Sequence, residues 1–169
     1  MYKKIGLFAA MFAVAGIANH VSAQASASAT ITANVLVPIS ITKVTDLNYG
    51  NISVSAVPGT LTIDPAGSRT ATGGVSLPVV SGTVTPATFT VNGAGGSTYS
   101  ITLPGAPTIL TSGANTMTSN SYASVPSGTG TLLLGSQTLA EGSTLTVGAS
   151  QAAGLYVSAT PFTVTVNYN

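Results

Sequence analysis

Side chains that could carry out acid–base, nucleophilic or metal chemistry are scarce in this chain. After its first 23 residues the sequence has no histidine and no cysteine, so the usual general bases, thiol nucleophiles and soft metal ligands are missing. Its three carboxylates are Asp46, Asp64 and Glu141, each close to a predicted turn. A hard-cation site needs several oxygen ligands in one place, and a glycosidase needs two carboxyl groups across one sugar bond. The sequence therefore predicts a non-enzyme without a metal or another cofactor.

One short motif formally matches a catalytic signature. Ser40 and Lys43 have the S-x-x-K spacing of acylating serine enzymes. On a helix these side chains would be neighbours, but the surrounding alternation predicts a strand, in which residues three apart point to opposite faces. No second signature motif accompanies the pair, so we interpret it as a coincidence. The run Gly93-Ala94-Gly95 likewise leads from strand to strand, without a helix N-terminus that would bind phosphate.

Threonine pairs of the form Thr-x-Thr recur along the chain, for example at residues 60–62, 144–146 and 163–165. A regular array of such pairs could order water on a flat surface, as an ice-binding protein does. The alternative is that threonine is simply a good solvent-facing strand residue. The irregular spacing of the pairs favours the second interpretation.

Residues 1–23 have the parts of a secretory signal peptide. Two lysines begin it, residues 5–17 form an apolar stretch, and Val21-Ser22-Ala23 is a small-residue cleavage site. We expect cleavage after Ala23, with Ala25 and Ala27 as alternatives. No later stretch is continuously apolar enough to span a membrane. The sequence predicts export through a periplasm to the cell surface or the extracellular space, with no membrane span after signal cleavage.

The chain that remains after cleavage has very few charges. Lys43 and Arg69 stand against the three carboxylates, two cations against three anions, which gives a formal net charge of −1. Charged residues make up 4% of the whole sequence, against roughly 25% in an ordinary soluble domain. Such a surface cannot neutralise a phosphate backbone, which excludes nucleic acid as a partner. It also opposes self-association weakly.

The pattern along the rest of the chain predicts one all-β domain over residues 38–169. Short runs of alternating apolar and polar residues are separated by Gly/Pro turns, which favours an antiparallel β-sandwich. Asp64-Pro65-Ala66-Gly67 suits a type I turn. Residues 89–91 and 99–103 flank a glycine-rich connection and predict a hairpin. We expect no convincing amphipathic helix after the first 23 residues; residues 149–156 are the sole candidate, limited to a turn or two by Gly154.

The segment before this domain, residues 24–37, is itself strand-like. Apolar and polar residues alternate with a period of two from Ala27 to Ile41. At ~3.3 Å per residue this run would be much longer than a usual strand. It either bends at Pro38 and serves two sheets, or it serves two molecules. We place the boundary at Pro38.

Two motifs carry a resemblance to known families. Leu47-Asn48-Tyr49-Gly50, which follows the alternating segment, resembles the Leu-x-Phe-Gly motif of spore coat protein U-type subunits and of archaic chaperone–usher pilins. The closing strand, with Gly154 upstream and Tyr168 next to last, is similar to the pilin C-terminal strand. Taken whole, the chain is identified as a member of a secreted bacterial domain-of-unknown-function family (DUF4402).

The resemblance implies an immunoglobulin-like, pilin-like sandwich that lacks one strand. A neighbouring subunit, after a periplasmic chaperone and with an usher, would supply that strand by β-augmentation. The protein would then be a non-catalytic structural subunit of a fimbria-like or cell-surface assembly, polymerising by donor-strand exchange. The implied donor residues are Ala29, Ile31, Ala33 and Val35. The implied wall of the acceptor groove consists of Phe162, Val164, Val166 and Tyr168.

The alternative is a self-contained secreted β-sandwich that works as a binding module, either an adhesin or a carbohydrate-binding domain. Residues 24–37 would then simply belong to a complete fold. Sugar binding would need exposed aromatic side chains, and most tyrosines fall on apolar strand faces. Tyr122, which we expect in a loop, is the exception.

Overall fold

The structure is a computed structural model that describes residues 23–169. The predicted signal peptide therefore lies outside the described residues, apart from Ala23. The chain divides into two compact units at Asn34 and Val35. In the described part of the first unit no strand is present, and the Ile31 side chain is 95% exposed. In the second unit the first strand begins at Ser40, so the segment 24–37 that was predicted as a strand carries none in the single chain.

The second unit is an antiparallel β-sandwich, which confirms the predicted fold class. Over residues 23–169 the chain has strands but no α-helix, and the weak candidate at 149–156 forms none. A single 3-10 turn, η1, covers Leu133–Gly135. The strands are β1 Ser40–Thr45, β2 Ser53–Ile63, β3 Arg69–Ser76, β4 Ala87–Asn92, β5 Thr98–Thr102, β6 Thr108–Ser112, β7 Asn115–Val125, β8 Thr129–Thr131, β9 Ser136–Val147, β10 Val157–Ser158 and β11 Thr165–Tyr168.

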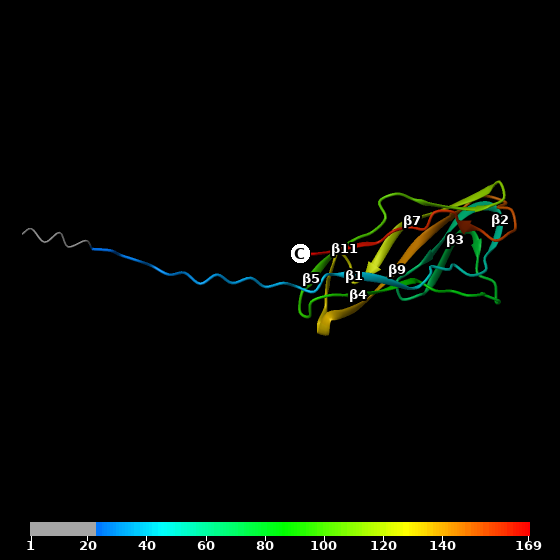
Figure 1. Cartoon of the computed structure of the whole chain (residues 1–169). Coiled ribbons are helices and arrows are strands. Elements are labelled where there is room, and N and C mark those ends of the chain that lie inside the picture. Colours follow the sequence, from blue (N-terminus) through cyan, green and yellow to red (C-terminus); the bar gives the residue numbers. More distant parts are fainter. Residues whose placement is uncertain (1–22) are drawn as a thin grey trace, which may run out of the picture. The chain divides into compact units, whose positions relative to one another are not determined.

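Strand β9 is the centre of the larger sheet. Its first half pairs with β4 and its second half with β2, while β7 pairs along its other edge. The sheet continues from β4 to β1 and from β7 through β6 to β10, and β3 pairs with β2. Figure 1 shows β9 running between β4 and β7. The smaller sheet has the order β11-β5-β8.

The turn between β2 and β3 forms where the sequence predicts it. The Gly67 N–H donates to the Asp64 carbonyl at 2.9 Å, and the Ser68 N–H donates to the Asp64 side chain at 2.8 Å. Gly67 has a φ of +88°, a conformation that costs glycine little. The turn thereby sets the register in which Ile63 faces Arg69.

The hairpin predicted over residues 89–91 and 99–103 is wrong. Strand β4 pairs with β1 and β9 in the larger sheet, whereas β5 pairs with β8 and β11 in the smaller one. The glycine-rich connection therefore crosses from one sheet to the other. Alternation showed that both runs are strands, but it says nothing about which strand lies beside which.

Apolar side chains form two clusters between the layers. One surrounds β2 and the second half of β9, with Tyr49 at its edge; its buried members are Tyr49, Leu61, Ile63, Val75, Met117, Leu145 and Val147. The other joins the two sheets around β5; its buried members are Val91, Tyr99, Ile101, Leu132, Leu139, Val164 and Val166. Their burial is the main source of stability, because this chain has no disulfide.

Several Thr-x-Thr pairs meet across strands. Thr60 hydrogen-bonds Thr72 at 2.7 Å, and Thr62 hydrogen-bonds Thr144 at 2.9 Å, in each case between directly opposed residues. Such cross-strand pairs stabilise a sheet by a few tenths of a kcal/mol to about 1 kcal/mol. The threonines thus have a structural use, in keeping with the second interpretation of these pairs.

Candidate functional site

Two neighbouring strands of the sandwich each leave one edge without a strand partner. Within residues 23–169, β1 pairs only with β4 and β11 pairs only with β5. The two strands nevertheless lie near each other, with Cα atoms within 8 Å (Figure 1). An unpaired edge presents a row of free backbone N–H and C=O groups that another strand can join. The gap between β1 and the last part of the chain is therefore the first candidate site.

A groove of about 710 Å³ lies beside the last part of β1. One wall runs from Lys43 to Ile52, and the other is formed by residues 154–158 with Pro161 and Phe162. The floor consists of the apolar side chains Ala87, Phe89, Leu110, Met117 and Leu145. The groove thus combines an apolar floor with strand residues of β1 on one side and of β10 on the other.

The residues singled out by family resemblance meet in this groove. Leu47, Tyr49 and Gly50 line one wall, and Gly154 lines the other. Leu47 packs against the Tyr49 cluster, and Gly50 has a φ of +69°. A Cβ atom at Gly50 would collide with the Ser81 carbonyl oxygen, so only glycine fits there. The motif therefore shapes the wall of the groove.

The predicted wall residues of the last strand divide into two sets. Phe162 lines the groove. Val164 and Val166 do not, because their side chains are buried in the cluster around β5. Phe162 also forms a tilted aromatic pair with Tyr122 of β7, with ring centroids 5.5 Å apart, and this contact connects the wall to β7. The structure thus brings one of the four predicted residues to the groove and places two in the core.

Tyr168, the fourth predicted residue, lies at the end of β11 beside the residues that precede β1. Its hydroxyl donates to the Val37 carbonyl at 2.6 Å and accepts from the Ala94 N–H at 2.6 Å. The side chain thereby fixes the chain just before Pro38, where the resident fold begins. One phenol joins the last strand, the β4–β5 connection and the start of the domain.

Replacing Tyr168 by phenylalanine is expected to lower the free energy of unfolding by about 1–2 kcal/mol, because the half-buried Ala94 N–H loses its acceptor. Urea unfolding measures this change. Asn167→Ala is the matched control, since that side chain points to solvent on the same strand and such changes usually stay within about 0.5 kcal/mol. Equal stability of Tyr168→Phe and the unsubstituted chain would contradict the role given to this hydroxyl.

The predicted donor residues are exposed where the structure describes them. The side chains of Ala29, Ile31, Ala33 and Val35 all face solvent, and Val35, in the second unit, is 92% exposed. An alternating apolar face left in water is unusual for a resident strand. Its pairing partner stays a prediction.

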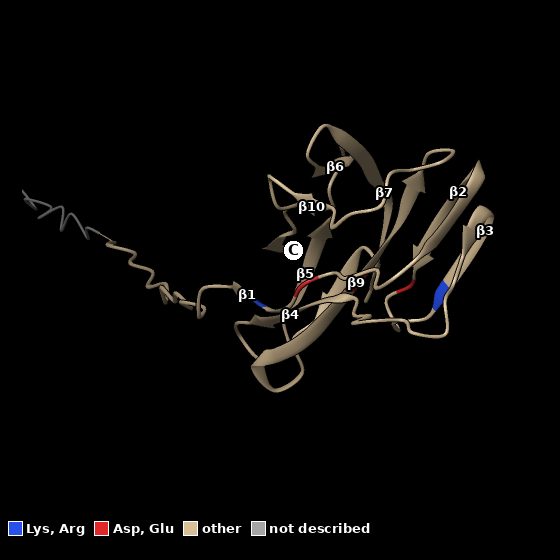
Figure 2. Cartoon of the chain, turned by 90° about the vertical axis from the view of Figure 1, so that its right-hand side faces the viewer, with Lys and Arg blue, Asp and Glu red and all other residues tan. Residues whose placement is uncertain are grey.

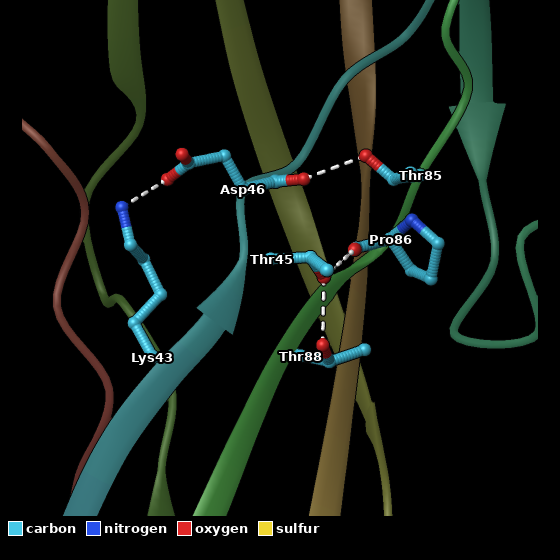
Figure 3. A network of polar contacts seen from close by, with 6 residues as sticks. All are labelled: Lys43, Thr45, Asp46, Thr85, Pro86 and Thr88. Atoms are coloured by element: carbon cyan, nitrogen blue, oxygen red, sulfur yellow. Dashed lines mark hydrogen bonds and ion pairs between the residues drawn. The ribbon is translucent and has the colours of Figure 1, made fainter.

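A polar network fastens β1 to β4 at the rim of the groove (Figure 3). Thr45 hydrogen-bonds Thr88 at 2.6 Å and donates to the Pro86 carbonyl, while Thr85 donates to the Asp46 carbonyl at 2.7 Å. Lys43 forms an exposed ion pair with Asp46 at 2.6 Å. Lys43 is thus engaged with a carboxylate three residues on, and Ser40 faces solvent on β1. Ser40 and Lys43 therefore do not form a nucleophile with a free base beside it.

Beneath the groove three hydroxyl groups form a closed triangle. Tyr49 lies 2.8 Å from Ser119 and 2.6 Å from Ser143, and the two serines are 2.9 Å apart. Each hydroxyl can donate one bond and accept another, so all three donors are used within the triangle. Burial raises the pKa of Tyr49 above its ordinary value. The triangle is a structural anchor for the motif tyrosine.

Glu141 was not singled out as a site residue from sequence, and it is the most unusual side chain here. It lies on the inner face of β9, is 0% exposed, and neither carboxyl oxygen has a hydrogen-bond partner. Burial raises its pKa to about 7. A buried polar group without a partner costs about 1–3 kcal/mol, and more if it is charged. The sequence signal for it is the alternation Leu139-x-Glu141-x-Ser143-x-Leu145, which puts one carboxylate on an apolar face.

Charges elsewhere on the sandwich are few and scattered over the ribbon (Figure 2). Among residues 23–169 no three His, Cys, Asp or Glu side chains gather where they could hold a metal ion. In the same part of the chain no helix is long and apolar enough to cross a membrane.

Tyr122 was expected in a loop, and this expectation is wrong. It lies within β7, is half-buried, and its hydroxyl donates to Thr108 at 2.6 Å. The remaining tyrosines of the described chain are buried or half-buried as well. No tyrosine among residues 23–169 is therefore fully exposed.

Comparison with known proteins gives one match. The family model described as "Domain of unknown function (DUF4402)" matches residues 39–168. No curated protein and no solved structure gave a significant match. The matched range begins directly after Pro38, so it contains the sandwich and leaves out residues 24–37.

Proposed function

We propose that this chain, which belongs to the family described as "Domain of unknown function (DUF4402)", is an exported structural subunit without catalytic activity. In this proposal it polymerises by donor-strand exchange into a fimbria-like or cell-surface assembly. The segment 24–37 of one subunit fills the groove of the next, and a periplasmic chaperone and an usher assist the exchange.

The observation that carries the proposal is the open groove beside the last part of β1, a strand that leaves one edge unpaired. An added strand pairs through backbone hydrogen bonds, and its alternate side chains enter pockets. Here the last part of β1 offers backbone with a free edge, and Ala87, Phe89 and Leu145 offer the apolar floor. A strand with Ala29, Ile31, Ala33 and Val35 on one face has the matching pattern.

Each donor side chain is expected to contribute only a modest binding free energy. Burying apolar surface contributes roughly 25 cal/mol per Å², so the two alanines add less than Ile31 and Val35. Ile31 is 95% exposed in the single chain, and its burial is the largest single gain that the exchange offers. Ile31 is therefore the residue whose replacement tests the proposal most directly.

Replacing Ile31 by aspartate is expected to abolish multimers, because a carboxylate would enter an apolar groove. The measurement is an unheated denaturing gel of protein sheared from the producing cells. The unsubstituted chain should give a ladder that collapses on heating, and Ile31→Asp should run as a monomer. Thr32→Asp is the matched control, since its side chain points to the opposite face of the same strand. It should keep the ladder.

Two results would count against the proposal. A single monomer band from the unsubstituted chain would exclude stable polymers of this kind. A ladder that persists in a variant lacking residues 24–35 would show that another surface joins the subunits.

The groove also supports one alternative, a self-contained secreted binding module. Its volume of about 710 Å³ lies within the ~300–1,000 Å³ of common ligand pockets. Its apolar floor fits an apolar ligand better than a sugar, because no tyrosine of the described chain is openly exposed. A monomer band together with a folded Ile31→Asp variant would favour this alternative.

A further inference from the structure

Glu141 lies directly beneath the groove that the proposed function uses. On β9 it stands between Leu139 and Ser143, and across the ladder it faces Ala87 of β4. Ala87 lines the groove, as does Tyr49, which is bonded to Ser143. The carboxyl group therefore occupies the inner face of the sheet at the level of the groove floor. Donor-strand exchange as proposed above does not use the Glu141 carboxyl group.

The groups packed around Glu141 donate no hydrogen bond to its carboxyl oxygens. From β7, Ser124 donates to the Pro126 carbonyl at 2.8 Å, and Ser119 belongs to the closed hydroxyl triangle with Tyr49 and Ser143. From β4, Ala87 and Phe89 are apolar. The other titratable side chains at the groove are Tyr156 and the ion pair of Lys43 with Asp46, which is exposed at the rim; Tyr122 also lies on β7.

We propose that Glu141 binds a proton when a strand fills the groove, so that subunit joining is coupled to pH. This inference rests on the proposed function and adds a regulation to it. The incoming face of Ala29, Ile31, Ala33 and Val35 carries no hydrogen-bond donor. It displaces water from the groove and leaves the ionised carboxylate still less solvated than before. Desolvation of this kind disfavours the charged form of an acid.

Linkage fixes the direction of the effect. If the filled groove holds the proton more tightly than the empty one, binding of the strand weakens as pH rises. In the empty groove burial already raises the pKa of Glu141 to about 7, so the transition falls in an accessible range. Suppose that filling the groove raises the pKa of Glu141 by about one more unit. The dissociation constant of the strand should then increase roughly five- to tenfold between pH 6 and pH 8.5.

A peptide-binding experiment measures this coupling. The donor is a capped, fluorescently labelled peptide of residues 24–37, which contains no titratable side chain. The acceptor is the full mature chain with Ile31→Asp, so that its own segment does not compete. Fluorescence anisotropy at pH 6 and pH 8.5 gives the dissociation constants. We expect the five- to tenfold weakening in this chain, and a flat profile once Glu141→Gln is added.

Asp64→Asn is the control for loss of a carboxylate, because Asp64 lies exposed in the turn after β2 and away from the groove. It should keep the full pH dependence. Calorimetry in two buffers of different ionisation enthalpy provides a second measurement that needs no change at Glu141. At pH 7.5 it should show net proton uptake on binding of the peptide.

The outcomes separate the two proposals. If the peptide binds at neither pH, both the donor-strand function and the proton coupling are wrong. If it binds with equal affinity at both pH values, or if Glu141→Gln keeps the pH dependence, the coupling alone is wrong. Tighter binding at pH 8.5 would also overturn it, since the occupant would then be supplying hydrogen-bond donors to the ionised group.

Discussion

Replacing Glu141 by methionine is expected to raise the free energy of unfolding by about 3 kcal/mol at pH 8 in the monomer. Burial raises the pKa of this carboxyl from 4.5 to about 7. Each pH unit of difference between the folded and unfolded chains corresponds to about 1.4 kcal/mol above both values. Methionine is unbranched like glutamate and adapts to irregular apolar space. It removes two buried oxygens that have no partner.

The sign of the pH dependence follows from the same difference. Below pH 4.5 the carboxyl is mostly protonated in both states, so the folded chain does not bear the cost of ionising a buried group. As pH rises towards about 7, the unfolded chain releases the proton first, so stability falls until the folded group also ionises. Stability should therefore be highest on the acidic side and level off above pH 7. Because residues 24–169 contain no histidine, no histidine of this part of the chain adds to this window.

Urea unfolding of the unsubstituted chain, Glu141→Met and Asp64→Asn at pH 5 and pH 8 measures these effects. The difference between the two pH values should disappear in Glu141→Met and persist in Asp64→Asn, whose carboxylate is exposed. If the unsubstituted chain were more stable at pH 8 than at pH 5, Glu141 would have an ionised partner, and its assignment as an isolated buried acid would be wrong.

Local structure was largely predictable because it depends on nearby residues. The period of two marked most strands, and Asp64-Pro65-Ala66-Gly67 specified the β2–β3 turn through its own backbone preferences. The same reasoning failed for residues 89–103. Their alternation defines β4 and β5, but the partners of these strands are set by burial on both sides of the sandwich. That information is spread over the whole chain.

The site was predictable in part, and for a comparable reason. The motif residues Leu47, Tyr49 and Gly50 came from resemblance, and they do line the groove. Val164 and Val166 share the alternation of Phe162, yet they are buried in the core around β5 and do not line the groove. Alternation separates the two faces of a strand but does not show which stretch of a face meets a gap.

A second large effect is expected at Gly130, where alanine should cost about 3 kcal/mol of stability. Gly130 on β8 lies opposite Tyr99 on β5. Tyr99 is fully buried, and its ring lies against the glycine so closely that a Cβ atom would collide with it. Overpacking of this kind costs about 1–3 kcal/mol. Displacing the ring would also break the bond from the Tyr99 hydroxyl to Gln137, which is 2.8 Å long.

The loss at Gly130 should spread to the edge of the smaller sheet. The Gln137 side-chain oxygen accepts from both the Tyr99 hydroxyl and the Thr131 N–H, so a shifted ring disturbs two bonds at once. Tyr99 also lies opposite Tyr168 of β11, whose hydroxyl donates to the Val37 carbonyl. A change at Gly130 is therefore expected to weaken the hydrogen bond between Tyr168 and Val37 as well as the packing of the core.

Gly105→Ala is the matched control for Gly130→Ala, because a Cβ atom at Gly105 would meet nothing within 4 Å. It should leave the urea midpoint nearly unchanged. The double variant with Tyr99→Leu separates the clash from a general effect of alanine: a smaller side chain at position 99 leaves room for the added methyl group. The two substitutions together should then cost less than the sum of the single changes. Additive costs would show that Gly130 is required for its backbone and not for the ring that covers it.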